Sequence, residues 1–220
     1  MSNPAPKASP VIAIDGPAAS GKGTLARRLA DHLNFAYLDT GALYRAVGLQ
    51  VLRNGGTGEN PDEAISAAQQ LKDLDLTDPE IRGESTGAIA SKVAAIPAVR
   101  SSLLDFQRDF AQTPPGGKAG AILDGRDIGT VVAPEANVKL FITANAETRA
   151  KRRFLEQYGP KGTDDEFAAI LNDLILRDER DSTRSSSPLI AAENAHLLDT
   201  TNSDIEAVFE QALSLISNKI

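Results

Sequence analysis

The chain has 220 residues, 41% of them hydrophobic and 24% charged, which is enough for one buried core with insertions and too few for several domains. Its net charge of -7 argues against nucleic-acid binding through a broadly basic surface, which needs many cations against backbone phosphates. The chain has no cysteine, so disulfides and thiolate chemistry are excluded. Its two histidines, His32 and His196, lie in no cluster that suggests a catalytic triad or a metal site.

The opening segment, MSNPAPKASP, contains three prolines and no apolar run. We expect a disordered tail over residues 1–10 and not a signal peptide. No later stretch approaches the roughly 20 apolar residues that span a bilayer, so we expect no membrane partner. A cytoplasmic location is compatible with these features and with the lack of cysteine.

The next segment reads VIAID, then GPAASGKG, then TLARRLADHL with its leucines at helical spacing. This order predicts a strand, a glycine-rich loop and a helix. Short apolar segments predict four further strands, at residues 35–39, 119–124, 138–144 and 195–200. Because helical patterns separate these strands, we predict an α/β fold with a parallel sheet flanked by helices.

The rest of the chain is expected to form attachments to this core. Residues 55–117 are mostly helical with a break at Pro97 and predict an inserted lobe, and residues 151–187 predict a lid. The single core would then comprise residues 10–54, 118–150 and 188–220. Helix starts are indicated at Asn60, which precedes a proline, and by capping-box spacing at Thr163 and Ser203.

The glycine-rich loop has the spacing of a phosphate-binding P-loop. Backbone N–H groups in such a loop wrap phosphate oxygens, the helix dipole favours the anion, and Lys22 would reach the outer phosphates of ATP. The strict motif has Ser or Thr directly after the lysine, whereas here Gly23 intervenes before Thr24, which we expect near Mg²⁺, directly or through water. A glycine-rich turn without a ligand is the alternative, which the flanking strand and helix disfavour. The predicted ATP-binding residues of the loop are Gly16, Pro17, Ala18, Ala19, Ser20, Gly21, Lys22, Gly23 and Thr24.

A second polar cluster, DGRD at residues 124–127, follows the predicted strand at 119–124. In a parallel sheet it emerges at the carboxyl edge, beside the phosphate loop. The pair Asp-Gly is also common in hairpin turns. We favour a site, because acids and an arginine there can serve Mg²⁺ and phosphate together. The residues are Asp124, Gly125, Arg126 and Asp127.

A charged continuation of an apolar helix face marks a third cluster. Phe167, Ile170, Leu171 and Leu174 form a stripe at spacings of three and four, and the same face continues with Arg177, Asp178 and Asp181. This pattern favours a helix whose end lines a polar cleft. A buried structural salt bridge is the alternative.

The loop variant GKGT, with LDTGALYR at 38–45, ASKVAAIPAVR at 90–100, LDGRDIGTVV at 123–132 and RDERD at 177–181, resembles the bacterial cytidylate kinases in sequence and order. The resemblance implies MgATP as donor, CMP and dCMP as acceptors, and in-line phosphoryl transfer without a covalent enzyme intermediate. It implies catalytic roles for Lys22, Arg126, Asp127 and Arg177. It also implies contacts with the acceptor nucleotide. Thr40 and Arg45 would lie at its base and phosphate, and Ser91 and Arg100 would recognise the pyrimidine. Arg126 and Asp127 would contact the nucleotide as well, Arg177 and Asp181 would meet its phosphate and sugar, and Arg184 would lie near the base.

Several alternatives stay open. Thr40 could be a turn residue and Ser91 a helix-surface residue. The segment KRRF at 151–154 could be a nucleic-acid patch, although we favour a helix face whose arginines, such as Arg149 and Arg153, close over ATP. The segment from 71 onward resembles a shortened insert without the family's small β-hairpin, so the choice between CMP and UMP stays open.

Rival functions make different predictions. A P-loop GTPase switch would carry NKxD and DxxG motifs, and the chain has neither. A kinase for UMP, AMP or shikimate is disfavoured only by the family resemblance, and a nucleotide-binding protein without turnover would form no ADP in response to an acceptor. We expect a monomer, because no long exposed apolar stripe indicates an interface.

Overall fold

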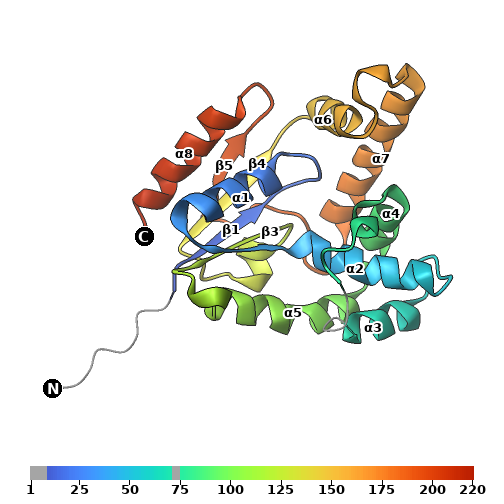
Figure 1. Ribbon diagram of the computed structural model, residues 1–220, viewed down its shortest axis with the longest axis horizontal. Coiled ribbons are helices and arrows are strands. Elements are labelled where there is room, and N and C mark those ends of the chain that lie inside the picture. Colours follow the sequence, from blue (N-terminus) through green and yellow to red (C-terminus); the bar gives the residue numbers. More distant parts are fainter. Residues whose placement is uncertain (1–8, 71–74) are drawn as a thin grey trace.

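The computed structural model describes residues 9–70 and 75–220 and shows a five-stranded parallel sheet with helices on both faces (Figure 1). The strand order is β2-β3-β1-β4-β5. The strands are β1 (Val11–Asp15), β2 (Ala36–Asp39), β3 (Ala121–Gly125), β4 (Val138–Thr143) and β5 (His196–Asp199). All five predicted strands are therefore confirmed, and so is the α/β class. The predicted tail at residues 1–10 lies almost wholly outside the described residues, as does part of the shortened insert.

Helices connect the strands and also make up most of the predicted lobe and lid ranges. They are α1 (Lys22–Leu33), α2 (Thr40–Arg53), α3 (Pro61–Gln69), α4 (Glu84–Val93), α5 (Pro97–Gln112), α6 (Ala146–Tyr158), α7 (Asp164–Thr183) and α8 (Ile205–Ser217). Short helical turns are η2 (Pro79–Arg82), η3 (Pro115–Gly117), η4 (Ile128–Val132) and η5 (Gly159–Lys161). Within the described part of the chain, none of the helices is long and apolar enough to cross a membrane.

Alternating side chains of the central strands divide the core into two layers. In β1, Ala13 faces the cluster built with α2, α3, α4 and α5, whereas Ile12 and Ile14 face the cluster built with α1 and α8. This division follows from the period of two along a strand. Helix α5 lies within the predicted lobe range but packs on β3, with Val99 and Leu103 fully buried in the same cluster as Ala13.

Capping explains where several helices begin. Asn60 caps α3 by accepting a hydrogen bond from the backbone N–H of Asp62, and Thr163 forms a complete capping box with Glu166 at α7. The expected cap at Ser203 is wrong. Asp204 takes that position instead and accepts from the N–H of Ala207, so α8 begins one residue later.

Candidate active site

The phosphate loop joins β1 to α1 and is held tightly against the sheet. A Cβ at Gly16, whose φ is 150°, would overlap the carbonyl oxygen of Ile142 in β4. Ala19 and Gly21 adopt left-handed conformations with φ of 58° and 88°, and Lys22 begins α1. The loop therefore turns at the start of the helix, where a helix binds anions.

A donor cavity of about 560 Å³ opens at this loop. Its walls also include Thr200 and two arginines of α6, Arg152 and Arg153. The predicted ATP-binding residues that line it are Ala19, Ser20, Gly21, Lys22, Gly23, Thr24 and Arg153. Gly16 and Pro17 precede this lining segment at the start of the loop, and Ala18 lines a second cavity.

The structure does not bring Arg149 to the donor cavity. Its guanidinium is buried beneath the loop, where it donates to the carbonyls of Ala144 (2.8 Å) and Ala18 (3.3 Å) and to Asp178 (2.6 Å). Arg152, which the sequence did not single out, lines the cavity instead and donates to both the hydroxyl and the carbonyl of Thr200.

A second cavity of about 170 Å³ adjoins the first and collects the predicted acceptor residues. All eleven line it: Thr40, Arg45, Ser91, Arg100, Asp124, Gly125, Arg126, Asp127, Arg177, Asp181 and Arg184. We call it the acceptor cavity. Ala19, Lys22 and Arg153 line both cavities, so the two meet at the phosphate loop.

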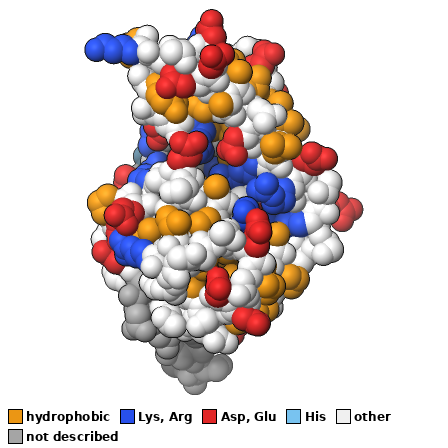
Figure 2. Space-filling view, turned by 90° about the vertical axis from the view of Figure 1, so that its right-hand side faces the viewer, with side chains coloured by type: hydrophobic (Ala, Val, Ile, Leu, Met, Phe, Trp, Pro, Cys, Tyr) orange, Lys and Arg blue, Asp and Glu red, His pale blue; other side chains and the backbone are white. Residues whose placement is uncertain are grey.

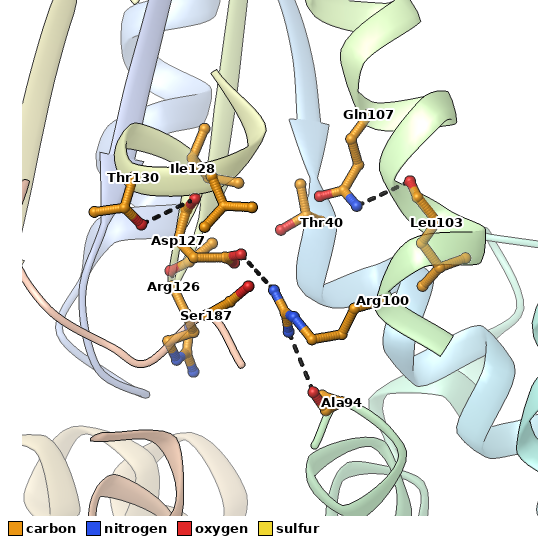
Figure 3. Close-up of polar contacts among 12 residues, drawn as sticks. Thr40, Ala94, Arg100, Leu103, Gln107, Arg126, Asp127, Ile128, Thr130 and Ser187 are labelled. Atoms are coloured by element: carbon orange, nitrogen blue, oxygen red, sulfur yellow. Dashed lines mark hydrogen bonds and ion pairs between the residues drawn. The ribbon is translucent and has the colours of Figure 1, made fainter. Parts of the chain in front are cut away.

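An acid–arginine pair forms one wall of the acceptor cavity (Figure 3). Arg100 donates to Asp127 at 2.5 Å and to the carbonyl of Ala94 at 3.2 Å, and it lies over the ring of Tyr44. Arg100 comes from α5 and Asp127 from the segment after β3, as Figure 3 shows. Three contacts thus fix the guanidinium plane at the cavity wall.

Asp124 is the second-last residue of β3 and is fixed from two sides. The Tyr37 hydroxyl donates to its Oδ2 at 2.7 Å, and the Thr40 hydroxyl donates to its backbone carbonyl at 2.7 Å. Burial raises the pKa of Asp124, against the opposing effect of nearby Lys22. A Cβ at Gly23 would lie 3.2 Å from Asp124 Oδ2, so this carboxylate lies beside the first turn of α1. Tyr37 was missed by the sequence reasoning.

The end of α7 supplies the opposite wall. As predicted, Ile170 and Leu174 are buried on the apolar face, and Asp181 continues it toward the cavity. Arg126 donates to Asp181 at 3.0 Å. Burial opposes ionisation of Asp181, yet the neighbouring arginines hold its pKa below the usual range. Burial, with Arg126 nearby, lowers the pKa of Arg177 to about 10.

Unused donors and positive charge characterise this site. Among the described residues, buried nitrogens without a hydrogen-bond partner include Nε of Arg45, Arg100 and Arg177 and Nη2 of Arg184. Figure 2 shows Lys and Arg side chains gathered across the middle of one face. Buried donors without partners are rare in folded proteins, and all four of these belong to residues that line the acceptor cavity. Their arrangement fits an anionic ligand with many acceptor oxygens.

A buried aspartate links the donor and acceptor sides. Asp15 ends β1 directly before the phosphate loop and accepts from the N–H groups of Ile128 and Gly129, each at 2.8 Å. Burial raises its pKa to about 6. Burial, followed by the repulsion of Arg126, lowers the pKa of Lys22 to about 7.

Other site residues escaped the sequence reasoning. Asp39 pairs with Arg45 at 2.7 Å and caps α2, and Tyr44 lines the acceptor cavity. Asp39 had a usable signal, because it ends a predicted strand at the same sheet edge as Asp124. The partners of Tyr44 lie on segments distant in the sequence, and no local pattern indicates them.

A phosphate loop whose cavity opens onto a small arginine-lined cavity defines a P-loop kinase that acts on a small anionic acceptor. The family model for cytidylate kinase matches residues 12–218. The chain belongs to the cytidylate kinase family, and its phosphoryl donor is accordingly ATP.

Individual comparisons agree. The chain is 54% identical over 211 residues to a cytidylate kinase of Paramagnetospirillum magneticum, covering 96% of this chain and 99% of the relative. It is 51% identical over 209 residues to a cytidylate kinase of Rhodospirillum rubrum, covering 95% and 98%. A solved shikimate kinase from Bacteroides thetaiotaomicron shares the fold with a TM-score of 0.50 at 15% identity, covering 96% of this chain and 99% of that one.

Proposed function

We propose that the chain transfers the γ-phosphoryl group of ATP to the 5′-phosphate of CMP and dCMP, giving ADP and CDP or dCDP. The observation that carries the proposal is the meeting of the donor and acceptor cavities at Lys22, with the unused arginine donors on the acceptor side. A phosphate oxygen of the acceptor would attack the γ-phosphorus as the bond to the β-phosphate oxygen breaks. The attacking oxygen is already anionic, so no general base is required.

Positioning and charge neutralisation would supply the catalysis. Lys22 would contact the β- and γ-phosphates, and the guanidinium groups of Arg126 and Arg177 would neutralise charge that accumulates between donor and acceptor. Arg45 and Arg184 line the acceptor cavity and would hold the acceptor with their guanidinium groups. Arg153 lines both cavities and would close over the transferred group. Arg149 supports the loop in our proposal, and Arg152 replaces it on the ATP side.

The wall formed by Arg100 and Asp127 supports cytosine over uracil. A carboxylate acceptor beside a guanidinium donor complements an amino group beside an unprotonated ring nitrogen, the edge that cytosine presents. Uracil places a carbonyl and an N–H at these positions, which would face Asp127 and Arg100 with matching polarity. Ser91 lines the same cavity and would add a hydroxyl contact to the base.

Magnesium is the expected companion of ATP. The described residues contain no cluster of three or more His, Cys, Asp or Glu arranged for a metal. Mg²⁺ bound with nucleotides needs only one or two protein groups beside phosphates and water, so the Thr24 hydroxyl and the Asp124 carboxylate near the loop fit it. When bound, the ion would supply charge neutralisation at the β- and γ-phosphates. The monomeric state and the cytoplasmic location remain predictions from the sequence.

The test is an assay of ADP formation with MgATP against CMP, dCMP, UMP, AMP, GMP and shikimate. We expect rapid turnover with CMP and dCMP and far less with the others. Preference for UMP would retain phosphoryl transfer and overturn the interpretation of Ser91, Arg100 and Arg184. ATP binding without turnover for any acceptor would overturn the proposed kinase function. Gel filtration with light scattering tests the monomer.

A further inference from the structure

One hydrogen bond joins the lid to the lobe directly above the acceptor cavity. Arg180 Nη1, near the end of α7, donates to the Ser91 hydroxyl on α4 at 2.7 Å. Ser91 is buried and lines the acceptor cavity, whereas Arg180 is exposed and lies outside that cavity. Arg180 therefore contacts Ser91, a proposed base-contacting residue, from outside the acceptor cavity.

Arg180 lines neither the donor cavity nor the acceptor cavity, but a smaller cavity beside them. A small cavity of about 120 Å³ separates α4 from the lid here, and Arg153, Asp173 and Arg177 belong to its lining. Arg177 also lines the acceptor cavity, as does Asp181, which follows Arg180 directly. On α7 the two neighbours thus face the acceptor, and Arg180 faces the lobe.

The chemistry of the hydroxyl makes this contact compatible with a bound base. A serine hydroxyl has one proton and two lone pairs. Arg180 occupies one lone pair, so the proton and the second lone pair remain available toward the cavity. The contact also restricts the rotation of the hydroxyl and holds α4 against α7 before a nucleotide arrives. Such restriction lowers the entropy that binding must otherwise remove.

We propose that Arg180 is a positioning residue for the acceptor base, acting through Ser91, an inference that rests on the proposed function. The positively charged guanidinium holds the Ser91 hydroxyl in its binding orientation and keeps lobe and lid in register. Arg180 itself contacts neither nucleotide. Its loss should therefore weaken acceptor binding while leaving the transfer step and ATP binding unchanged.

The test compares Arg180→Met, Arg180→Lys, Ser91→Ala and the double variant Arg180→Met with Ser91→Ala. In Arg180→Met we expect the KM for CMP to rise about five- to tenfold, which corresponds to the net contribution of one ordinary hydrogen bond, because the lost contact acts on binding only through Ser91. The kcat and the KM for ATP should stay within about twofold, because neither the donor cavity nor the reacting groups change. Only one guanidinium nitrogen is used, so a lysine ammonium should restore part of the affinity.

The double variant decides whether Arg180 acts through Ser91. If it does, Arg180→Met adds nothing in the Ser91→Ala background, which is the non-additivity of groups that act as one unit. Arg82→Met is the matched control, because it removes an exposed positive charge from the lobe at η2. It should leave the KM for CMP unchanged.

Three results would overturn the inference: an unchanged or lower KM for CMP in Arg180→Met, effects that add in the double variant, or an equal rise in Arg82→Met. Failure of the proposed function looks different, because wild-type protein would then show no turnover with CMP. The Arg180→Lys variant keeps a charged donor at the same place. If Arg180→Met folds poorly, the KM for CMP of Arg180→Lys with and without Ser91→Ala provides the same comparison.

Discussion

Replacing Asp15 by asparagine tests how a buried charge is tolerated between the two halves of the site. The carboxylate accepts two backbone N–H groups, whereas an amide has one acceptor oxygen and presents N–H to the other donor. One buried donor of Ile128 or Gly129 is then unsatisfied, which costs about 1–3 kcal/mol. This loss is partly offset, because the variant avoids the cost of keeping an ionised carboxylate in a buried position.

The sign of the pH dependence follows from the raised pKa of Asp15. Its pKa rises from 3.8 to about 6 on folding, so between these values the folded protein holds a proton that the unfolded chain has released. The free energy of unfolding of the wild type therefore falls as the pH rises through this window and then levels, by about 3 kcal/mol in all. The Asp15→Asn variant lacks this titration, so we expect its stability deficit to be larger at pH 5 than at pH 8.

Urea unfolding at pH 5 and pH 8, at constant ionic strength, measures this effect. The deficit of Asp15→Asn relative to wild type should shrink by about 1–2 kcal/mol between these two values, because only the upper half of the titration window lies between them. Asp31→Asn, which removes an exposed carboxylate from α1, controls for the change in net charge. A deficit that is independent of pH, or that grows toward pH 8, would refute the reasoning.

Three further predictions concern the phosphate loop and the acceptor wall. Gly16→Ala should destabilise the fold by about 1–3 kcal/mol and raise the KM for ATP, as measured by urea unfolding and kinetics, because the new Cβ overlaps the Ile142 carbonyl. ATP binding should take up about half a proton at pH 7 and about 0.9 of a proton at pH 8, since phosphates raise the pKa of Lys22 from about 7 back toward its usual value. Isothermal titration calorimetry in buffers of different ionisation enthalpy measures this uptake, and binding heats that do not vary with the buffer would contradict it. Asp181→Asn should lower the unfolding free energy by about 3–5 kcal/mol, because Arg126 loses its buried partner. CMP should then raise the melting temperature less than it does in wild type, because the cavity loses an acceptor contact and the fixed orientation of Arg126.

The fold could be predicted because each strand has a clear signal within its own few residues. Runs such as VIAID are short, apolar and bounded by turn signals, and the helices between them dictate parallel pairing. The cap of α8 shows the limit of local patterns. Ser203 and Asp204 are both good capping residues, and the sequence spacing favoured the first, whereas the backbone presents the N–H of Ala207 to Asp204.

Only the site residues that lie within or beside recognisable sequence motifs could be predicted. The motif segments contain all the residues predicted to bind the acceptor except Arg184, which follows the last segment closely, and the structure places all eleven around one cavity at the carboxyl edge of the sheet. Motifs did not separate Arg149 from Arg152, which stand three residues apart on α6 and differ only in how the helix is rotated toward the loop. The contact of Arg180 with Ser91 joins segments 89 residues apart, and nothing local encodes it.

The acceptor cavity gathers several arginines that would repel one another if each were bare. Carboxylates relieve this repulsion by pairing with them: Asp39 with Arg45, Asp127 with Arg100 and Asp181 with Arg126. Each pair also fixes a guanidinium plane while some of its nitrogens stay free. An incoming phosphate then meets donors that are already oriented, so little reorganisation accompanies transfer. Removing one of these acids would make the cavity more positive and yet a poorer site, because orientation would be lost along with the negative charge.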